Sequence, residues 1–197
     1  MHRLNALLDH YLIAPHEELP SIEQAVWSTF GEERAVFVLD MSGFSKLTRR
    51  YGLVHFLSMV RRMQLVTLPI VQDHGGQNIK YDADNLFATF ATTTEAIKAA
   101  SDINAAFAKG NELTDDSRDI HVSIGIDKGR ILLIPGKDLF GDAVNIAAKL
   151  GEDLAERGEV LISAAAASDL GERHHWPMEH RSYNVSGLTI EAYAVRV

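Results

Sequence analysis

Residues 35–40 read AVFVLD, a run of five apolar residues that ends in the carboxylate of Asp40. An uninterrupted run of this kind is typical of a strand buried on both faces of a sheet. After Gly43 the pattern turns helical over 44–51 and about 53–73. The stretch therefore predicts a central strand that carries an acid at its end and leads into a helical layer.

The rest of the chain predicts a mixed α/β (α+β) domain. Two strands, 78–80 and 86–90, surround a turn at 82–85 and form a hairpin with acids at its tip. An alanine-rich helix over about 93–109 follows. Further elements are expected as a second hairpin (strands 120–126 and 130–134 around a turn at 127–129), a helix over about 142–157, a strand at 160–162, a small helix at 163–170 and strands at 183–185 and 190–197. The order predicts a ferredoxin-like sandwich core with extra strands.

Residues 1–30 predict an N-terminal helical extension, separate from a domain at 31–197. Leu4, Leu7 and Leu8 begin an apolar stripe at helical spacing. Residues 21–24 (SIEQ) match a capping box for a second helix that runs to about Phe30. The stripe packs on its own domain or a twin subunit, or the extension is a docking arm for a regulatory partner.

Composition excludes several functional classes. The chain has 197 residues and a formal net charge of −8, which disfavours binding to nucleic acid. It has no cysteine, so disulfides, thiolate zinc sites, iron–sulfur clusters and cysteine nucleophiles are excluded. No leader pattern begins the chain and no run approaches the roughly 20 apolar residues of a membrane span. We therefore expect a cytoplasmic protein with no nucleic-acid or membrane partner.

Two carboxylates, Asp40 and Asp84, lie at a strand end and at a strand turn. They would meet at one edge if the first strand lies beside the 78–90 hairpin. Paired acids repel unless a cation bridges them, and Mg²⁺ takes carboxylates together with substrate phosphates. The pair predicts a metal and phosphate site, and the alternative is that both are ordinary turn residues.

Three segments, in order, carry a family resemblance. They are residues 37–45 (FVLDMSGFS), residues 79–84 (IKYDAD) and residues 138–149 (DLFGDAVNIAAK). They resemble the class III adenylate/guanylate cyclases, in which an apolar strand ends in Asp before Gly-Phe and a hydroxyl, a hairpin reads Lys-x-x-Gly-Asp, and a third segment reads Asp-x-Trp-Gly-x-x-Val-Asn-x-Ala-Ser-Arg. The resemblance spans about residues 35–165 and implies the fold of the cyclase catalytic domain.

The resemblance implies a two-metal phosphate site. Asp40 and Asp84 would bind two divalent cations, Mg²⁺ or Mn²⁺, with the Met41 carbonyl as a further ligand. One ion would activate the ribose 3′-hydroxyl, and both would neutralise charge on the α-phosphate and the leaving pyrophosphate. Amides around Ser42, Gly43 and Phe44, at a helix N-terminus, would hold phosphates.

The resemblance also implies a base pocket and ATP as the substrate. Lys80 and Asp138 fall where the family recognises the base. The lysine donor matches the acceptor N1 of adenine, and the aspartate acceptor matches its exocyclic amine. Guanine has a donor at N1 and an acceptor at O6, so it would match neither residue. Asn145 would orient the ribose, and Lys149 would stabilise the transition state.

Three departures from the family pattern bear on activity. Lys149 stands where the family has an arginine. Lysine lacks the planar guanidinium that binds phosphate through two hydrogen bonds, which predicts a slower chemical step. The C-terminal segment 184–189 (NVSGLT) lacks the family's lysine for the terminal phosphates, and Lys137, Lys128 or Arg130 are the candidate substitutes. Ala83 replaces the glycine of the hairpin turn.

The family resemblance implies a homodimer, because its metal acids come from one subunit and its base-reading residues from the other. The main hypothesis is an adenylate cyclase that converts ATP to cyclic AMP and pyrophosphate. The alternative is a cyclase-like nucleotide-binding or regulatory module with little or no turnover.

Overall fold

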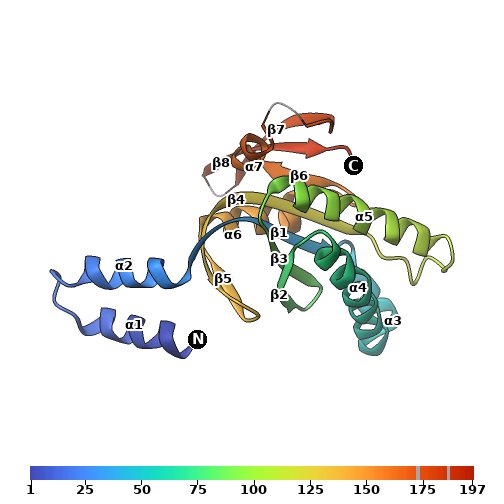
Figure 1. The fold of residues 1–197 in the computed structure, drawn as a ribbon. Coiled ribbons are helices and arrows are strands. Elements are labelled where there is room, and N and C mark those ends of the chain that lie inside the picture. The colour runs from blue at the N-terminus through green and yellow to red at the C-terminus, as the bar shows by residue number, and fades with distance from the viewer. Residues whose placement is uncertain (172–173, 186) are drawn as a thin grey trace.

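A mixed β-sheet forms the centre of the protein (Figure 1). The computed structural model describes residues 1–171, 174–185 and 187–197, without the side chains of 44–47 and 188. Over these residues the strand order is β2-β3-β1-β4-β6-β8-β7, and β5 pairs with β4 outside this path. The strands are β1 (Gly31–Met41), β2 (Gln77–Asp82), β3 (Asn85–Phe90), β4 (Val122–Ile134), β5 (Asp138–Phe140), β6 (Val160–Ser163), β7 (Met178–Val185) and β8 (Leu188–Val195).

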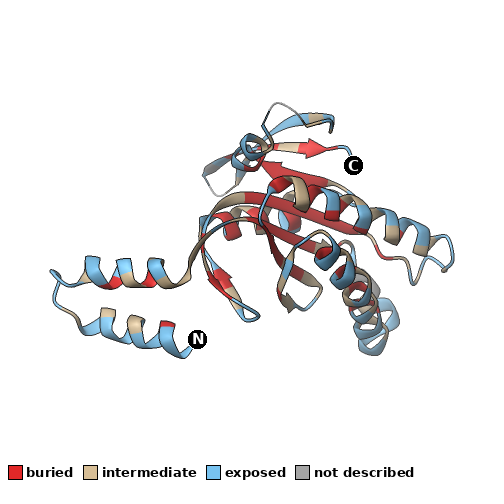
Figure 2. Cartoon of the chain, in the orientation of Figure 1, coloured by how far each residue is buried: buried red, intermediate tan, exposed pale blue. Residues whose placement is uncertain are grey.

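Helices cover both faces of the sheet, as the buried run at 35–39 predicts. Phe37 and Leu39 face a core shared with α4 (Leu53–Asp73), α5 (Thr93–Asn111) and α7 (Ala164–Leu170). Val36 and Val38 face the opposite core, which α6 (Asp142–Ala148) completes. Figure 2 shows the buried residues concentrated on these central strands. The first helix after β1, α3 (Phe44–Tyr51), lies beside α4.

The predicted second hairpin is wrong. Residues 122–134 form the single strand β4, which pairs with β1 from Met41↔Val122 to Gly31↔Leu132. The expected turn falls in the middle of this ladder, where Asp127 lies opposite Val36. Asp127 is buried, and its carboxylate accepts hydrogen bonds from the Ser163 hydroxyl and the Lys128 backbone amide. These bonds satisfy the carboxylate inside the sheet, so the residue does not mark a turn. The chain reverses after Ile134 and returns as β5, in which Asp138 pairs with Ile134.

The helix predicted over 142–157 is shorter and changes character. After α6 the chain continues as a π-helix, η1 (Lys149–Leu154). Two glycines allow this helix to lie directly against the sheet, because neither position has room for a side chain. A Cβ at Gly125 would lie 2.1 Å from the Ala147 carbonyl oxygen, and a Cβ at Gly151 would lie 2.7 Å from the Val38 carbonyl oxygen. Side chains on η1 are therefore held close to β1 and β4.

The N-terminal extension is a pair of helices, α1 (His2–Ile13) and α2 (Leu19–Phe30), that projects from the sheet (Figure 1). Leu4 and Val26 pack with Ile134 at the end of β4. The capping box at 21–24 is wrong, because α2 begins two residues earlier and the Ser21 hydroxyl donates to the Glu18 carbonyl at 2.8 Å.

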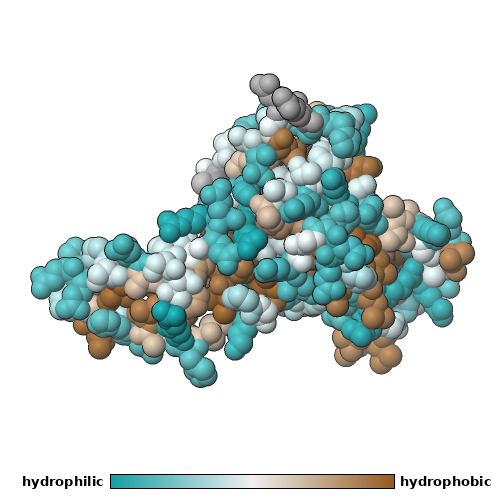
Figure 3. All heavy atoms as spheres, viewed as in Figure 1, coloured by the Kyte–Doolittle hydropathy of each residue, from teal (hydrophilic) through white to brown (hydrophobic). Residues whose placement is uncertain are grey.

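Apolar side chains remain exposed on the extension. Figure 3 shows apolar surface there, and Leu12 and Ile13 are 80% and 83% exposed. Among the described residues, no helix combines the length and apolarity needed to cross a membrane.

Candidate functional site

The two predicted metal acids lie at the same end of the sheet. Asp40 is near the end of β1, opposite Asn85, the first residue of β3, and Asp84 directly precedes Asn85. Both carboxyls are partly buried. Burial, followed by the charges of Asp84, Glu152 and Asp153, raises the pKa of Asp40 from 3.8 to about 7. Burial also raises the pKa of Asp84. Three acids thus add negative charge around Asp40, a setting that a cation would stabilise.

Oxygen donors at this end of the sheet fit a divalent cation. The amide oxygen of Asn85 is buried and accepts no hydrogen bond from any described residue, while its nitrogen donates to Glu152 Oε1 at 3.0 Å. The side chain of Met41 is buried, so only its backbone carbonyl is available as the expected further ligand. The described residues contain no group of three or more acidic or histidine side chains arranged around one point. An open pair of carboxylates is what a site shared with substrate phosphates requires.

The turn that carries Asp84 is strained. Ala83 has a φ of +51°, and it is the one non-glycine residue among those described with a positive φ. The family's turn glycine would adopt this angle without cost, whereas a Cβ makes it unfavourable by about 1 kcal/mol. The alanine at position 83 therefore has a conformational cost in the hairpin that carries the predicted metal ligand Asp84.

The loop after β1 meets the expectation for a phosphate loop in part. Gly43 has a φ of +80° and precedes α3. The Ser42 amide, however, donates to the His121 carbonyl at 2.8 Å, so it is already engaged and does not face a phosphate. The side chain of Phe44 lies outside the described residues. Any phosphate contact from backbone amides falls to the residues after Ser42.

The predicted base-reading residues lie together. Lys80 Nζ on β2 is 2.8 Å from Asp138 Oδ1 on β5. The ammonium also lies 4.9 Å from the centroid of the Phe87 ring, and Asp138 Oδ1 accepts a hydrogen bond from the Leu139 amide at 2.9 Å. One donor and one acceptor are thus held side by side next to an aromatic face.

Asn145 and Lys149 follow one another by one helical turn. The Lys149 amide donates to the Asn145 carbonyl where α6 passes into η1. The Asn145 side chain is exposed, and Lys149 Nζ lies 3.9 Å from Asp153.

Two of the three candidate substitutes for the missing phosphate lysine are engaged elsewhere. Lys128 Nζ donates to the Ala91 carbonyl at 2.7 Å and lies 3.6 Å from Asp169. The Arg130 guanidinium lies 4.3 Å from the Trp27 ring centroid, on the N-terminal extension. Lys137 is exposed in the turn between β4 and β5.

Sequence reasoning missed three polar residues near the site. Arg157 follows η1, and its Nη2 lies 3.5 Å from where a Cβ on Gly43 would stand. Asn85 and Glu152 are hydrogen-bonded to each other beside the predicted metal ligands Asp40 and Asp84. Asn85 directly follows Asp84, so its position in the sequence could have indicated it. Arg157 and Glu152 approach the site only because of the way the π-helix packs on the sheet.

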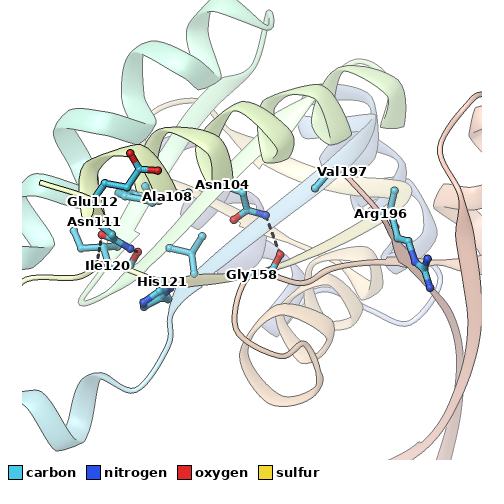
Figure 4. A pocket seen from close by; sticks show the side chains of 12 residues that line it. Asn104, Ala108, Asn111, Glu112, Ile120, His121, Gly158, Arg196 and Val197 are labelled. Atoms are coloured by element: carbon cyan, nitrogen blue, oxygen red, sulfur yellow. Dashed lines mark hydrogen bonds between the residues drawn. The ribbon is translucent and has the colours of Figure 1, made fainter. Parts of the chain in front are cut away.

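One cavity of the described part of the chain lies away from these residues. It measures about 720 Å³ between α5, the start of β4 and the end of β8. Figure 4 shows Asn104 reaching the Gly158 carbonyl and Asn111 bonded to Ile120 within it. None of the predicted site residues lines it. The cavity borders the site at His121, whose carbonyl accepts a hydrogen bond from the Ser42 amide, and at Val122, which pairs with Met41.

Comparison with known proteins places the chain in a family. Residues 30–196 match the model of the adenylate and guanylate cyclase catalytic domain. The chain belongs to this family of nucleotide cyclase domains, as the sequence motifs indicated.

Two curated relatives are about one-third identical to the chain over the region that aligns. It is 32% identical over 129 residues to putative adenylate cyclase 3 of Rhizobium meliloti (strain 1021), covering 66% of this chain and 22% of that protein. It is 31% identical over 137 residues to an adenylate cyclase of Glutamicibacter nicotianae, covering 70% and 32%. The chain thus spans about a fifth to a third of the length of these relatives.

A solved structure supports the fold. The adenylate/guanylate cyclase/hydrolase from Silicibacter pomeroyi superposes with a TM-score of 0.69 at 30% identity, covering 84% of this chain and 96% of that one. The ferredoxin-like fold of the cyclase type is thereby confirmed.

Proposed function

We propose that this protein is an adenylate cyclase that converts ATP to 3′,5′-cyclic AMP and pyrophosphate. The observation that carries the choice of ATP is the pairing of Lys80 with Asp138 at 2.8 Å. Adenine presents an acceptor at N1 beside a donor on its exocyclic amine, so it satisfies the ammonium and the carboxylate together. Guanine presents a donor and an acceptor in the opposite order and would leave both partly buried groups unmatched. Both relatives carry the name adenylate cyclase, which supports the same choice.

The reaction is an in-line displacement at the α-phosphorus. The ribose 3′-oxygen forms a bond to phosphorus and loses its proton, while the bond to the bridging oxygen of the β-phosphate breaks and pyrophosphate leaves. Two divalent cations, Mg²⁺ or Mn²⁺, would supply activation of the hydroxyl and neutralisation of phosphate charge. Asp40, Asp84 and the Met41 carbonyl would hold them. Asn145 would orient the ribose, and Lys149 would stabilise charge on the phosphates.

The proposed active form is a homodimer. Each chain would supply its metal acids to one site and its base-reading and ribose residues to the other. A twofold axis would therefore build two equivalent sites from one self-complementary interface.

The N-terminal extension is the proposed contact for regulation. Its adjacent apolar side chains Leu12 and Ile13 are almost fully exposed and would be available to a partner. A regulatory partner bound through residues 1–30 would act on β1 directly, because α2 runs into this strand at Gly31.

A second candidate is a binding module with little turnover. It is favoured by Lys149, which lacks the bidentate fork of arginine and lies near Asp153. The two candidates separate in a turnover assay of the wild type and Lys149→Arg with ATP and GTP. Cyclic AMP formation that rises in the variant supports the cyclase. Tight nucleotide binding without product from either protein supports the module.

A further inference from the structure

An arginine lies beside the loop that follows the metal-binding strand. Arg157 is in the segment between η1 and β6, and the neighbouring Gly158 amide donates to the Val122 carbonyl at 2.8 Å. This bond ties the segment to the first residue of β4, directly opposite Met41 in the sheet. The guanidinium consequently reaches the loop, with Nη2 3.5 Å from the position of a Cβ on Gly43.

The charge of Arg157 is not neutralised within the described part of the chain. No described carboxylate lies within ion-pair distance of its guanidinium, and its side chain is exposed. The charge of Arg157 also acts on a neighbouring histidine: burial lowers the pKa of His121, and the nearby guanidinium lowers it further. Arg157 is therefore a cation with no ion-pair partner among the described residues, beside a glycine loop in a protein of net charge −8.

The environment of this guanidinium matches a polyphosphate. Gly43 presents no side chain, and α3 begins immediately after it, so backbone and guanidinium face the same space. Asp40, the expected metal ligand, lies three residues before Gly43, so the loop follows directly from the strand that carries it. Arginine binds phosphate oxygens through two parallel hydrogen bonds, which a lysine cannot do.

We propose that Arg157 binds the terminal phosphates of the nucleoside triphosphate and takes the role of the lysine that the C-terminal segment lacks. This inference rests on the proposed function for the identity of the substrate. It assigns the role to the same subunit that supplies Asp40 and Asp84. Lys128 and Arg130, by contrast, are held by other partners.

The test is a binding measurement that requires no turnover. The full chain, Arg157→Ala, Arg157→Lys and the control Arg61→Ala are titrated calorimetrically with tripolyphosphate and with adenosine, each in the presence of Mn²⁺. Arg61 is an exposed arginine on α4 and serves as the matched loss of charge. Circular dichroism melts check that each variant is folded.

Arg157→Ala is expected to weaken tripolyphosphate binding by roughly tenfold or more, with a smaller loss in Arg157→Lys and none in Arg61→Ala. Adenosine binding is expected to be unchanged in all variants. Equal tripolyphosphate affinity in the wild type and Arg157→Ala overturns the proposal, as does a wild type that binds no tripolyphosphate. Arg157-dependent binding by a protein that forms no cyclic AMP upholds the proposal and refutes the cyclase activity instead.

Discussion

Replacing Asp40 by asparagine is expected to stabilise the metal-free protein. Burial and the neighbouring acids raise the pKa of the Asp40 carboxyl from 3.8 to about 7. The folded-state pKa is above the unfolded value, so the folded state loses stability as the pH rises from about 4 to about 7, and the cost stays constant above that range. The full shift corresponds to about 4 kcal/mol. Because the carboxyl is only half-buried, water screens it, and about 1–2 kcal/mol is the expected gain at pH 8.

Urea unfolding of the wild type and Asp40→Asn, in excess chelator at pH 5 and pH 8, measures this gain. At pH 5 the advantage of the variant should fall to about a third of its value at pH 8, since stability changes linearly with pH between the two pKa values. Adding Mn²⁺ in place of chelator should stabilise the wild type and remove the advantage. A variant that is less stable at pH 8, or an advantage that does not vary with pH, would refute the electrostatic account of this site.

Three further predictions concern the stability of two segments near the site and the recognition of the base. Asn111→Ala removes both side-chain hydrogen bonds to the backbone before β4 and should lower the free energy of unfolding by about 2 kcal/mol, measured by urea denaturation. Ala83→Gly relieves a positive φ and should raise stability by about 0.5 kcal/mol, seen as a higher Tm; a lower Tm would show that the turn is not strained. Lys80→Glu combined with Asp138→Lys should shift kcat/KM from ATP toward GTP, and an unchanged preference would exclude these residues from base recognition.

The local pattern of the sequence was sufficient for most elements of the fold. The buried run at 35–39, the hairpin at 78–90 and the paired helices after Gly43 are all present. These segments carry their own signal, because burial on two faces and turn residues are encoded within a few positions.

Long-range pairing decided the elements that the sequence did not predict. Residues 127–129 have turn composition, but β1 lies alongside for its whole length and holds them in a strand. The π-helix after Ala148 depends on Gly125 and Gly151, which lie far apart in the chain and meet only in the fold. Ser21 has the right neighbours for a cap, yet Pro20 already lies within the first turn of the helix.

The same distinction applies to the candidate site. Asp40, Asp84 and the pair Lys80 and Asp138 belong to motifs, and the structure brings each pair together. Arg157 belongs to no motif, and only the packing of its segment on the start of β4 brings it to Gly43.

Detection of cyclic nucleotides by mass spectrometry tests the central claim most directly. The purified wild type and Asp40→Ala are incubated with ATP, GTP, CTP and UTP, each with Mg²⁺ or Mn²⁺. The account predicts cyclic AMP from the wild type, none from Asp40→Ala, and no product from the other three nucleotides. Folded, dimeric wild-type protein that forms no cyclic nucleotide, or that forms cyclic AMP independently of Asp40, would contradict it.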